Sequence, residues 1–245
     1  MMDSSRLPGR WYLQNGKLNE GIHVFESIIK PNSKDLLWLG ILHLKQGRAG
    51  IAEGYLGDAL AMSEKAGDLQ VESACLCMLS RVNTDRGDFS SAMDLVIKAQ
   101  ETSAQGEYQS KALAFHALAY CLRISRDFEG SARAYKCAIE ILHEAGDSRR
   151  MNEEIRNLAT VMFLNGEIGE SEKLLRSIRG SFSKRGPYFE AYTHVDEAII
   201  SFIEGGFEKS QRYVMKARSA IEDCEQILDP DEEMILVYLS NSFPR

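Results

Sequence analysis

Proline is scarce in this sequence, and its few copies leave a long interior without any. Prolines stand at positions 8, 31, 187, 230 and 244 of 245 residues, so residues 32–186 contain none. Proline breaks helix interiors, and this stretch is rich in Ala, Leu, Glu, Lys and Met, which favour helix. Strand signals are also missing, because no alternating run of Val, Ile, Thr and aromatic residues ends at an Asn-Gly-type turn. The sequence therefore predicts an all-α chain.

Cysteine and long apolar runs are scarce as well. Five cysteines, an odd number, do not indicate the framework of a disulfide-rich secreted domain. No apolar run approaches the roughly 20 residues that span a bilayer. The N-terminal segment lacks the charged-then-apolar layout of a signal peptide. We therefore expect a cytoplasmic protein that does not contact a membrane.

Positive charge is in deficit. The chain carries 29 Lys and Arg against 36 Asp and Glu, which gives a net charge of −7 and a pI of about 5.4. Nucleic-acid-binding surfaces are usually basic, because binding there releases phosphate counterions. We expect no direct contact with nucleic acid. The 44% of hydrophobic residues is enough for a substantial core.

Motifs for cofactors, metals and catalysis are incomplete. The glycines of Gly47–Gly57 lack both the Lys-Ser/Thr pair of a phosphate loop and a preceding strand. Cys75 and Cys77 would project about 200° apart on a helix. The acidic run that starts at Asp229 has Met234 where a calcium loop needs glycine. No nucleophile, base and orienting group stand together, so we expect no cofactor, no metal and no catalytic residue.

Glycine marks a period of about 40 residues. One series is spaced by 39 or 40 residues, and a second series with the same spacing falls about halfway between its members. The two series are Gly67, Gly106, Gly146 and Gly186, and Gly47, Gly87, Arg126, Gly166 and Gly205. A residue that ends a helix commonly takes a left-handed conformation, which glycine tolerates. The spacing therefore predicts a repeated helical hairpin.

Apolar and small residues follow the same period. Small residues stand five positions after Gly16 and after each member of the second series, at Gly21, Ala52, Ala92, Ser131, Ser171 and Ser210. Upstream of it, a stripe at i, i+3, i+4 and i+7 places one small residue among large ones, as on an amphipathic helix. In the last unit the stripe improves when it is shifted by one residue, so we expect Gly205-Gly206 to accommodate one extra residue.

This large–large–small–large stripe, turn and small–aromatic–small second helix resemble the tetratricopeptide repeat (TPR). The period exceeds the standard 34 residues and resembles the long-helix subclass of bacterial regulator sensor domains. The resemblance implies an all-α, right-handed α-solenoid of about six hairpins in a single domain. We expect units at 5–30, 33–66, 68–105, 107–145, 147–185 and 187–228, and a capping helix over 230–241. Asp229 is the expected N-cap of that last helix, which covers the last hydrophobic face.

The resemblance also implies a concave groove lined by first-helix residues that flank the core stripe. Carried over position by position, these are Arg81, His116, Tyr120, Arg123, Arg156, Asn157 and Thr160. Three arginines inside an acidic protein are suited to an acidic or carboxylate-bearing peptide. The alternative is a solvated helix face with ordinary charges. We expect these arginines to serve a partner site and not the fold.

A second apolar stripe, Leu37, Ile41 and Leu44, lies beside the core stripe of the second unit. A surface this apolar is usually covered, and the N-terminal segment, a second copy of the chain or a partner helix would each cover it. The sequence thus favours a non-catalytic interaction module that binds a peptide or partner segment in a regulatory or sensor role. The alternative is a structural assembly factor that forms a homodimer through its apolar end surfaces.

Overall fold

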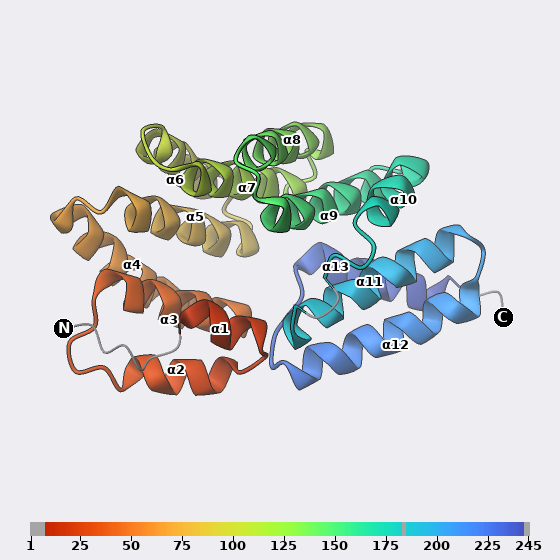
Figure 1. Ribbon diagram of the computed structural model, residues 1–245, viewed down its shortest axis with the longest axis horizontal. Helices are drawn as coiled ribbons and strands as arrows, with labels where there is room; N and C mark the ends of the chain where they lie inside the picture. Colours follow the sequence, from red (N-terminus) through yellow and green to blue (C-terminus); the bar gives the residue numbers. More distant parts are fainter. Residues whose placement is uncertain (1–7, 183–184, 243–245) are drawn as a thin grey trace.

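The computed structural model describes residues 8–182 and 185–242, and these residues form thirteen helices (Figure 1). The first twelve pair in chain order as antiparallel hairpins, and α13 follows them. Residues 5–7 of the expected first unit and 183–184 of the fifth lie outside the described residues. The helices are α1 (Gly9–Gln14), α2 (Leu18–Glu26), α3 (Ser33–Lys45), α4 (Ala49–Ala66), α5 (Leu69–Asp85), α6 (Phe89–Ser103), α7 (Tyr108–Ile124), α8 (Phe128–Glu144), α9 (Ser148–Leu164), α10 (Ile168–Ser177), α11 (Pro187–Ile203), α12 (Phe207–Asp223) and α13 (Pro230–Asn241).

The turns have the left-handed backbone that the glycine spacing predicts. Seven glycines of the two series have φ between 66° and 112°, namely Gly47, Gly67, Gly87, Gly146, Gly166, Gly186 and Gly205. Arg126, the non-glycine member, adopts the same conformation with φ of 70°. Gly106 is the exception, since it lies outside the left-handed region and its amide donates to the Ser103 carbonyl at 2.8 Å.

Aspartates directly after the turns begin the next helix in four places. Each side chain accepts a hydrogen bond from the backbone N–H three residues later, at 2.8–3.2 Å. These caps are Asp68, Asp88, Asp127 and Asp147. A cap of this kind stabilises a helix by about 1 kcal/mol, so a glycine–aspartate turn both ends one helix and starts the next.

Serines at the small position fasten the two helices of a hairpin together. The hydroxyls of Ser131, Ser171 and Ser210 each donate to the backbone carbonyl twelve residues earlier, at 2.8 Å. The acceptors are the small residues of the first-helix stripe, Ala119, Ala159 and Ala198. The separation of twelve is the same in the last unit. The expectation that Gly205-Gly206 accommodates an extra residue is therefore wrong.

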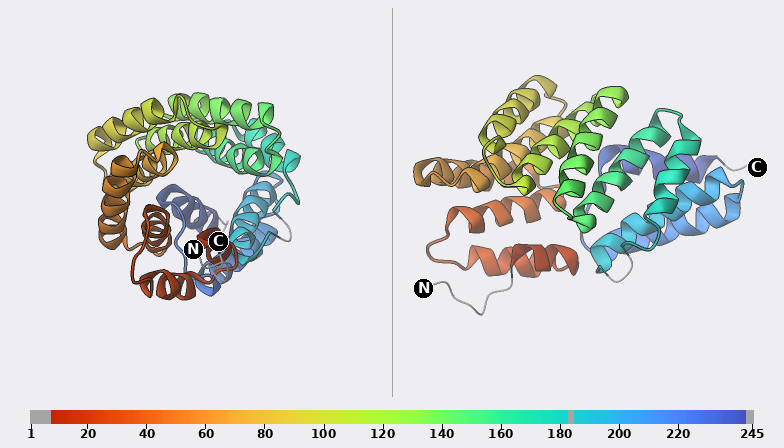
Figure 2. Two further views of the ribbon diagram at one scale, coloured as in Figure 1. Left: turned by 60° about the vertical axis from the view of Figure 1, so that its left-hand side comes forward. Right: turned by 45° about the horizontal axis from the view of Figure 1, so that its top comes forward.

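The hairpins follow one another around a turn that brings the first beside the last, and α13 lies inside this turn (Figure 2, left). Helix α1 packs on α11. The amide of Ile227, in the link before α13, donates to the Lys45 carbonyl at the end of α3 at 2.9 Å. Among the described residues, no helix is long and apolar enough to cross a membrane.

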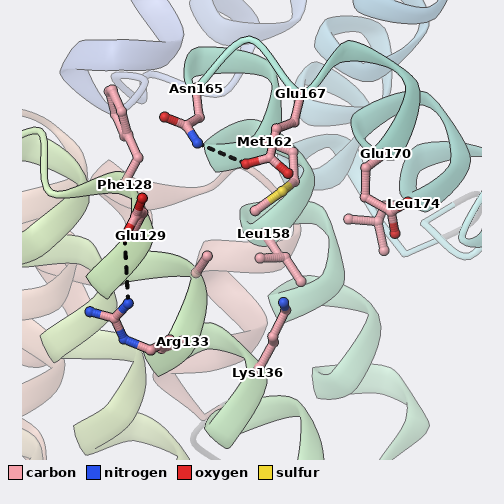
Figure 3. A pocket seen from close by; sticks show the side chains of 11 residues that line it. Phe128, Glu129, Arg133, Lys136, Leu158, Met162, Asn165, Glu167, Glu170 and Leu174 are labelled. Carbon is pink, nitrogen blue, oxygen red and sulfur yellow. Dashed lines mark hydrogen bonds and ion pairs between the residues drawn. The ribbon is translucent and has the colours of Figure 1, made fainter.

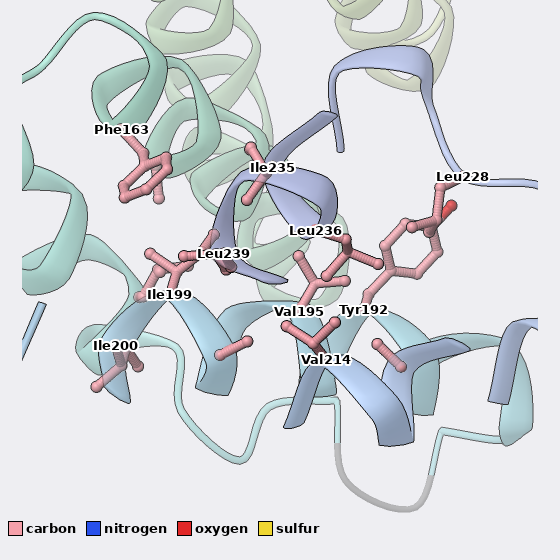
Figure 4. Close-up of a cluster of buried hydrophobic side chains, with 14 of the residues drawn as sticks. Phe163, Tyr192, Val195, Ile199, Ile200, Val214, Leu228, Ile235, Leu236 and Leu239 are labelled. Atoms are coloured by element: carbon pink, nitrogen blue, oxygen red, sulfur yellow. The ribbon is translucent and has the colours of Figure 1, made fainter. Parts of the chain in front are cut away.

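Helix α13 covers the apolar face of the last hairpin, as expected. Ile235, Leu236 and Leu239 are at most 2% exposed and belong to one cluster with Val195 and Ile199 of α11 (Figure 4). The opposite side of α13 is exposed. Its N-terminal turn reaches further, toward helices α5, α7 and α9, and this extension positions the candidate site.

Candidate functional site on the concave side

Arginines on consecutive hairpins meet one acidic segment on the inner side of the solenoid. Arg81 of α5 and Arg123 of α7 both pair with the carboxylate of Asp229, and the Arg123 Nη2–Asp229 Oδ2 distance is 2.7 Å. Arg123 also pairs with Asp231, with its Nε 2.9 Å from Oδ2. The side chain of Arg123 is fully buried. Two guanidinium groups and two carboxylates thus form one buried ionic cluster.

Arg156 of α9 continues this cluster on the next hairpin. Its Nη1 lies 2.5 Å from Oε1 of Glu232, in the first turn of α13. Its Nε lies 2.9 Å from Oδ1 of Asp196, on α11. We call Arg81, Arg123 and Arg156 the arginine row. Each member meets a carboxylate of the acidic segment that runs from Asp229 to Glu232.

Other side chains of the hairpins contact the arginine row and support it. The ring of Tyr120 lies under two guanidinium groups, with its centroid 4.6 Å from Cζ of Arg81 and 5.3 Å from Cζ of Arg123. The Tyr120 hydroxyl donates to Asp85 at 2.5 Å, and Asp85 lies 3.7 Å from Nε of Arg81. Cation–π contacts and ion pairs of this kind fix the direction of a guanidinium plane.

Arg156 has equivalent support from the last hairpin. Its Cζ lies 4.5 Å from the ring centroid of Tyr192, and Asp196 accompanies it from the same helix, α11. Arg81 and Arg156 therefore each have an aromatic and an acidic partner within the hairpins. These groove contacts do not involve α13.

Burial and charge act in opposite directions on the two aspartates of the segment. Burial disfavours the charged form of Asp229, but Arg81, Arg123 and Lys45 outweigh it and hold the pKa of that carboxyl well below its usual value. For Asp231 burial dominates over the attraction of Arg123 and raises the pKa to about 6. The pKa values of these two carboxyls, which are two residues apart in the chain, are therefore shifted in opposite directions.

Asp196 resembles Asp231 in its electrostatics. Burial is the largest effect on its carboxyl, the neighbouring Glu232 adds to it, and together they outweigh Arg156 and raise the pKa to about 6. Two of the carboxyls that pair with the arginine row, Asp196 and Asp231, therefore have a pKa of about 6, raised mainly by burial.

Four of the seven predicted groove residues meet in this cluster, and three do not. The cluster contains Arg81, Tyr120, Arg123 and Arg156. His116 instead pairs with Glu154, at 2.9 Å from Nδ1 to Oε2, and the Asn157 amide donates to the same carboxylate at 3.3 Å. Thr160 is 2% exposed and its hydroxyl donates to the Arg156 carbonyl within α9. Thr160 therefore presents no free hydroxyl to the groove.

The apolar stripe of the second unit is covered by the chain itself. Leu37 is 9% and Leu44 is 5% exposed, and Ile41 is half-buried beside them. Their cluster includes Tyr12 and Phe25 of the first hairpin. The other members of this cluster belong to the same chain and come from the first hairpin and also from α4 and α5.

A surface pocket of about 500 Å³ lies elsewhere, between α8, α9 and α10 (Figure 3). Leu158 and Met162 line it together with charges of both signs, among them Lys136 and Glu170. None of the predicted groove residues lines this pocket. Among the described residues, no three His, Cys, Asp or Glu side chains are grouped as metal ligands.

No family model and no curated protein sequence matches this chain. Solved structures do match it at low identity. A Rap protein complexed with Competence and Sporulation Factor has a TM-score of 0.69 at 12% identity, over 95% of this chain and 72% of that one. A putative kinesin light chain with TPR-like repeats, from Podosopora anserina, has a TM-score of 0.53 at 16% identity, over 76% and 92% of the two chains. The chain has a TPR-like α-solenoid fold.

BtubC from P. vanneervenii is a third similar structure, with a TM-score of 0.58 at 16% identity, over 91% of this chain and 95% of that one. These structural matches establish the TPR-like fold. Because the identities are low, the functional residues have to be argued from this chain itself. The carboxylates that meet the arginine row, Asp229, Asp231 and Glu232, were not among the sequence-predicted site residues. The available signal was complementary charge, since among the described helices α13 alone has more than one acidic residue in its first turn, and three arginines were expected on the inner side.

The expected capping role of Asp229 is wrong. Asp229 occupies the N-cap position of α13 and Pro230 follows at the first helical position, but the Asp229 side chain makes no capping hydrogen bond. Both of its oxygens are used by Arg81 and Arg123 instead. A charge-assisted bond to a guanidinium is stronger than one to a neutral amide, which explains why the carboxylate turns toward the groove.

Proposed function

We propose that this chain is a protein-interaction module whose concave side binds an acidic helical segment of a partner protein through the arginine row. One observation carries the proposal, namely that the row already pairs with three carboxylates within four residues, Asp229 to Glu232, at the start of α13. Guanidinium groups held over aromatic rings are suited to carboxylate recognition. The same geometry therefore supports recognition of a partner with the same chemistry.

The TPR-like architecture supports a binding role on this side. Stacked hairpins are stabilised by contacts with their neighbours, so the inner surface is free to carry residues chosen for a ligand. A Rap protein of similar fold has been solved in complex with Competence and Sporulation Factor. We infer a regulatory role from this likeness, with a protein or peptide as the partner.

A photo-crosslinker placed on the concave side tests the proposal. The full chain would carry p-benzoylphenylalanine in place of Asn157, which is half-buried on α9 next to Arg156. We expect it to capture a partner segment with at least two carboxylates within four residues, identified by mass spectrometry. Adding Arg81→Gln and Arg156→Gln should abolish this product.

A matched control separates the groove from the rest of the surface. Arg133 on α8 has a side chain that is 71% exposed and lies outside the arginine row. The change Arg133→Gln removes one positive charge and should leave capture unchanged. A partner that is captured equally well after both arginines of the row are neutralised would contradict the proposal.

A further inference from the structure

We propose that residues 225–242, the C-terminal segment, act as an intramolecular ligand of the arginine row, and that an acidic amphipathic helix of a partner takes their place. This inference rests on the proposed function and adds its regulation. The partner helix it requires has an acidic first turn, matching Asp229–Glu232, and apolar residues at the spacing of Ile235, Leu236 and Leu239.

The receiving side is organised independently of the C-terminal segment. Arg81 has Tyr120 and Asp85 as groove partners, and Arg156 has Tyr192 and Asp196. When the segment leaves, these contacts keep both guanidinium groups oriented. A binding site that is already organised loses less conformational freedom when a ligand binds.

The C-terminal segment can leave without unwinding another helix, and its link then gives up the backbone hydrogen bond from Ile227 to Lys45. It follows α12, the link from Cys224 to Leu228 is irregular, and α13 is the last helix described. One side of α13 is exposed: Met234 is 53%, Val237 is 45% and Tyr238 is 55% exposed. A partner helix with a similar apolar face would cover the last hairpin in its place, so the exchange leaves no core exposed.

The fit of the segment to the arginine row is incomplete. Within the described part of the chain, the buried atoms Arg123 Nη1, Arg156 Nη2 and Glu232 Oε2 have no hydrogen-bond partner. A buried polar atom without a partner carries a desolvation penalty. A partner with carboxylates placed to accept from these nitrogens would therefore bind the row more favourably than the C-terminal segment does.

Attachment within one chain explains how an imperfect ligand still occupies the site. A short link gives the tethered segment an effective concentration on the order of millimolar. A partner must bind the arginine row tightly enough to compete with the tethered segment at this effective concentration. The segment therefore sets the lowest affinity or concentration at which a partner can bind. Weakening the segment should lower that threshold, and this is the measurable consequence.

The test measures binding of a fluorescein-labelled synthetic peptide with the sequence of residues 225–242 to the full chain. The acid–amide variant carries Asp229→Asn, Asp231→Asn and Glu232→Gln, which weakens the tethered segment and leaves the row intact. We expect this variant to bind the probe at least tenfold more tightly than the wild type. Equal affinity of the folded variant and the wild type would overturn the inference.

The control variant removes the same charge from exposed positions next to the segment. Glu208→Gln, Glu222→Gln and Asp223→Asn lie on α12 and touch no arginine of the row. This variant should bind the probe as the wild type does. Equal tightening in the control and the acid–amide variant would show that net charge is responsible, which overturns the inference.

Failure of this inference and failure of the proposed function give different results. If the wild type binds the probe tightly and loses it on Arg123→Gln, while circular dichroism shows that this variant is folded, the row is a binding site and the tethered segment does not block it. If the acid–amide variant binds tightly and keeps the probe after Arg123→Gln is added, the row is not the binding site. The first result overturns the inference alone, and the second overturns both proposals.

Hydrogen exchange of the wild type tests the same point without a substitution in the segment. An isotope-labelled peptide of residues 225–242 is added in excess, so that its mass distinguishes it from the tethered copy. We expect the backbone amides of residues 231–241 in the chain to exchange faster. Unchanged exchange while the peptide is bound would overturn the inference. A wild-type dimer that dissociates in the acid–amide variant would also overturn it, because the segment would then dock in a second copy.

Discussion

The guanidinium of Arg123 meets the carboxylate of Asp229 at 2.7 Å, although 106 residues separate them in the chain. The pair joins the fourth hairpin to the start of α13 inside the solenoid. Both side chains are buried, and Arg81 and Asp231 complete the charges around them. The pair therefore links the candidate binding surface to the stability of the fold.

Arg123→Ala should destabilise the protein strongly. The change leaves Asp231 buried without its cation and deprives Asp229 of one of two, which for a buried pair costs about 3–5 kcal/mol. The sequence alone led to the opposite expectation, a change within about 0.5 kcal/mol. Urea unfolding followed by circular dichroism measures the difference, with Arg133→Ala as the exposed control. A loss no larger than in the control would show that the cluster adds nothing to stability.

The carboxyls of Asp196 and Asp231 should make stability depend on pH. Each has a folded-state pKa of about 6, raised by burial, against about 3.9 when unfolded. The folded state therefore binds these protons more tightly. The resulting stabilisation is fully present below about pH 4 and is lost as the pH rises through about 6. The charges facing the two groups are Arg156, Glu232 and Glu197 for Asp196, and Arg123, Asp229 and Glu232 for Asp231.

The measurement compares the free energy of unfolding at pH 5 and pH 7.5 with that of an Asp196→Asn/Asp231→Asn variant. The wild type should gain on the order of 2 kcal/mol relative to the variant on acidification. This comparison cancels His43 and His194, whose pKa values burial lowers and which act in the opposite direction. Parallel pH profiles of the two proteins would exclude these aspartates as the cause.

Local signals in the sequence were sufficient for the hairpins. The spacing of Gly47, Gly87 and Gly166 reflects a backbone conformation that each turn needs by itself, and the structure shows it. The Ser171–Ala159 hydrogen bond explains why small residues recur at two fixed places. Such constraints act over a few residues or between neighbouring helices, so they can be recognised in a single sequence.

The position of the acidic turn depends on longer range and was not predicted. Arg81 and Asp229 are 148 residues apart. An amphipathic helix with an acidic first turn is compatible with ordinary capping, and Asp229 has the residue type of a good N-cap. Which role it takes depends on how far the hairpins curve, because the curvature brings the end of α12 beside α3. Curvature is a sum of small rotations per repeat that residue types do not specify.

Ala159→Leu should destabilise the fifth hairpin. Ala159 is fully buried and its carbonyl accepts the Ser171 hydroxyl at 2.8 Å, so α9 and α10 approach closely there. Overpacking such a contact costs about 1–3 kcal/mol. Thermal unfolding measures the loss, and Ala61→Leu at an exposed position of α4 is the matched control. Equal stability of the two variants would mean that this close approach is absent in solution.

Leu44→Ala should lower stability without changing the association of the chain. Leu44 is 5% exposed within the cluster formed with the first hairpin, and truncating a buried leucine costs about 2–5 kcal/mol. Because its contacts are within one chain, the loss should be the same at two protein concentrations tenfold apart in urea unfolding. Leu69→Ala, at a position that is 47% exposed on α5, should change stability by about 0.5 kcal/mol or less. A loss that depends on protein concentration would instead place Leu44 at an interface between two copies and would favour the assembly role considered from the sequence.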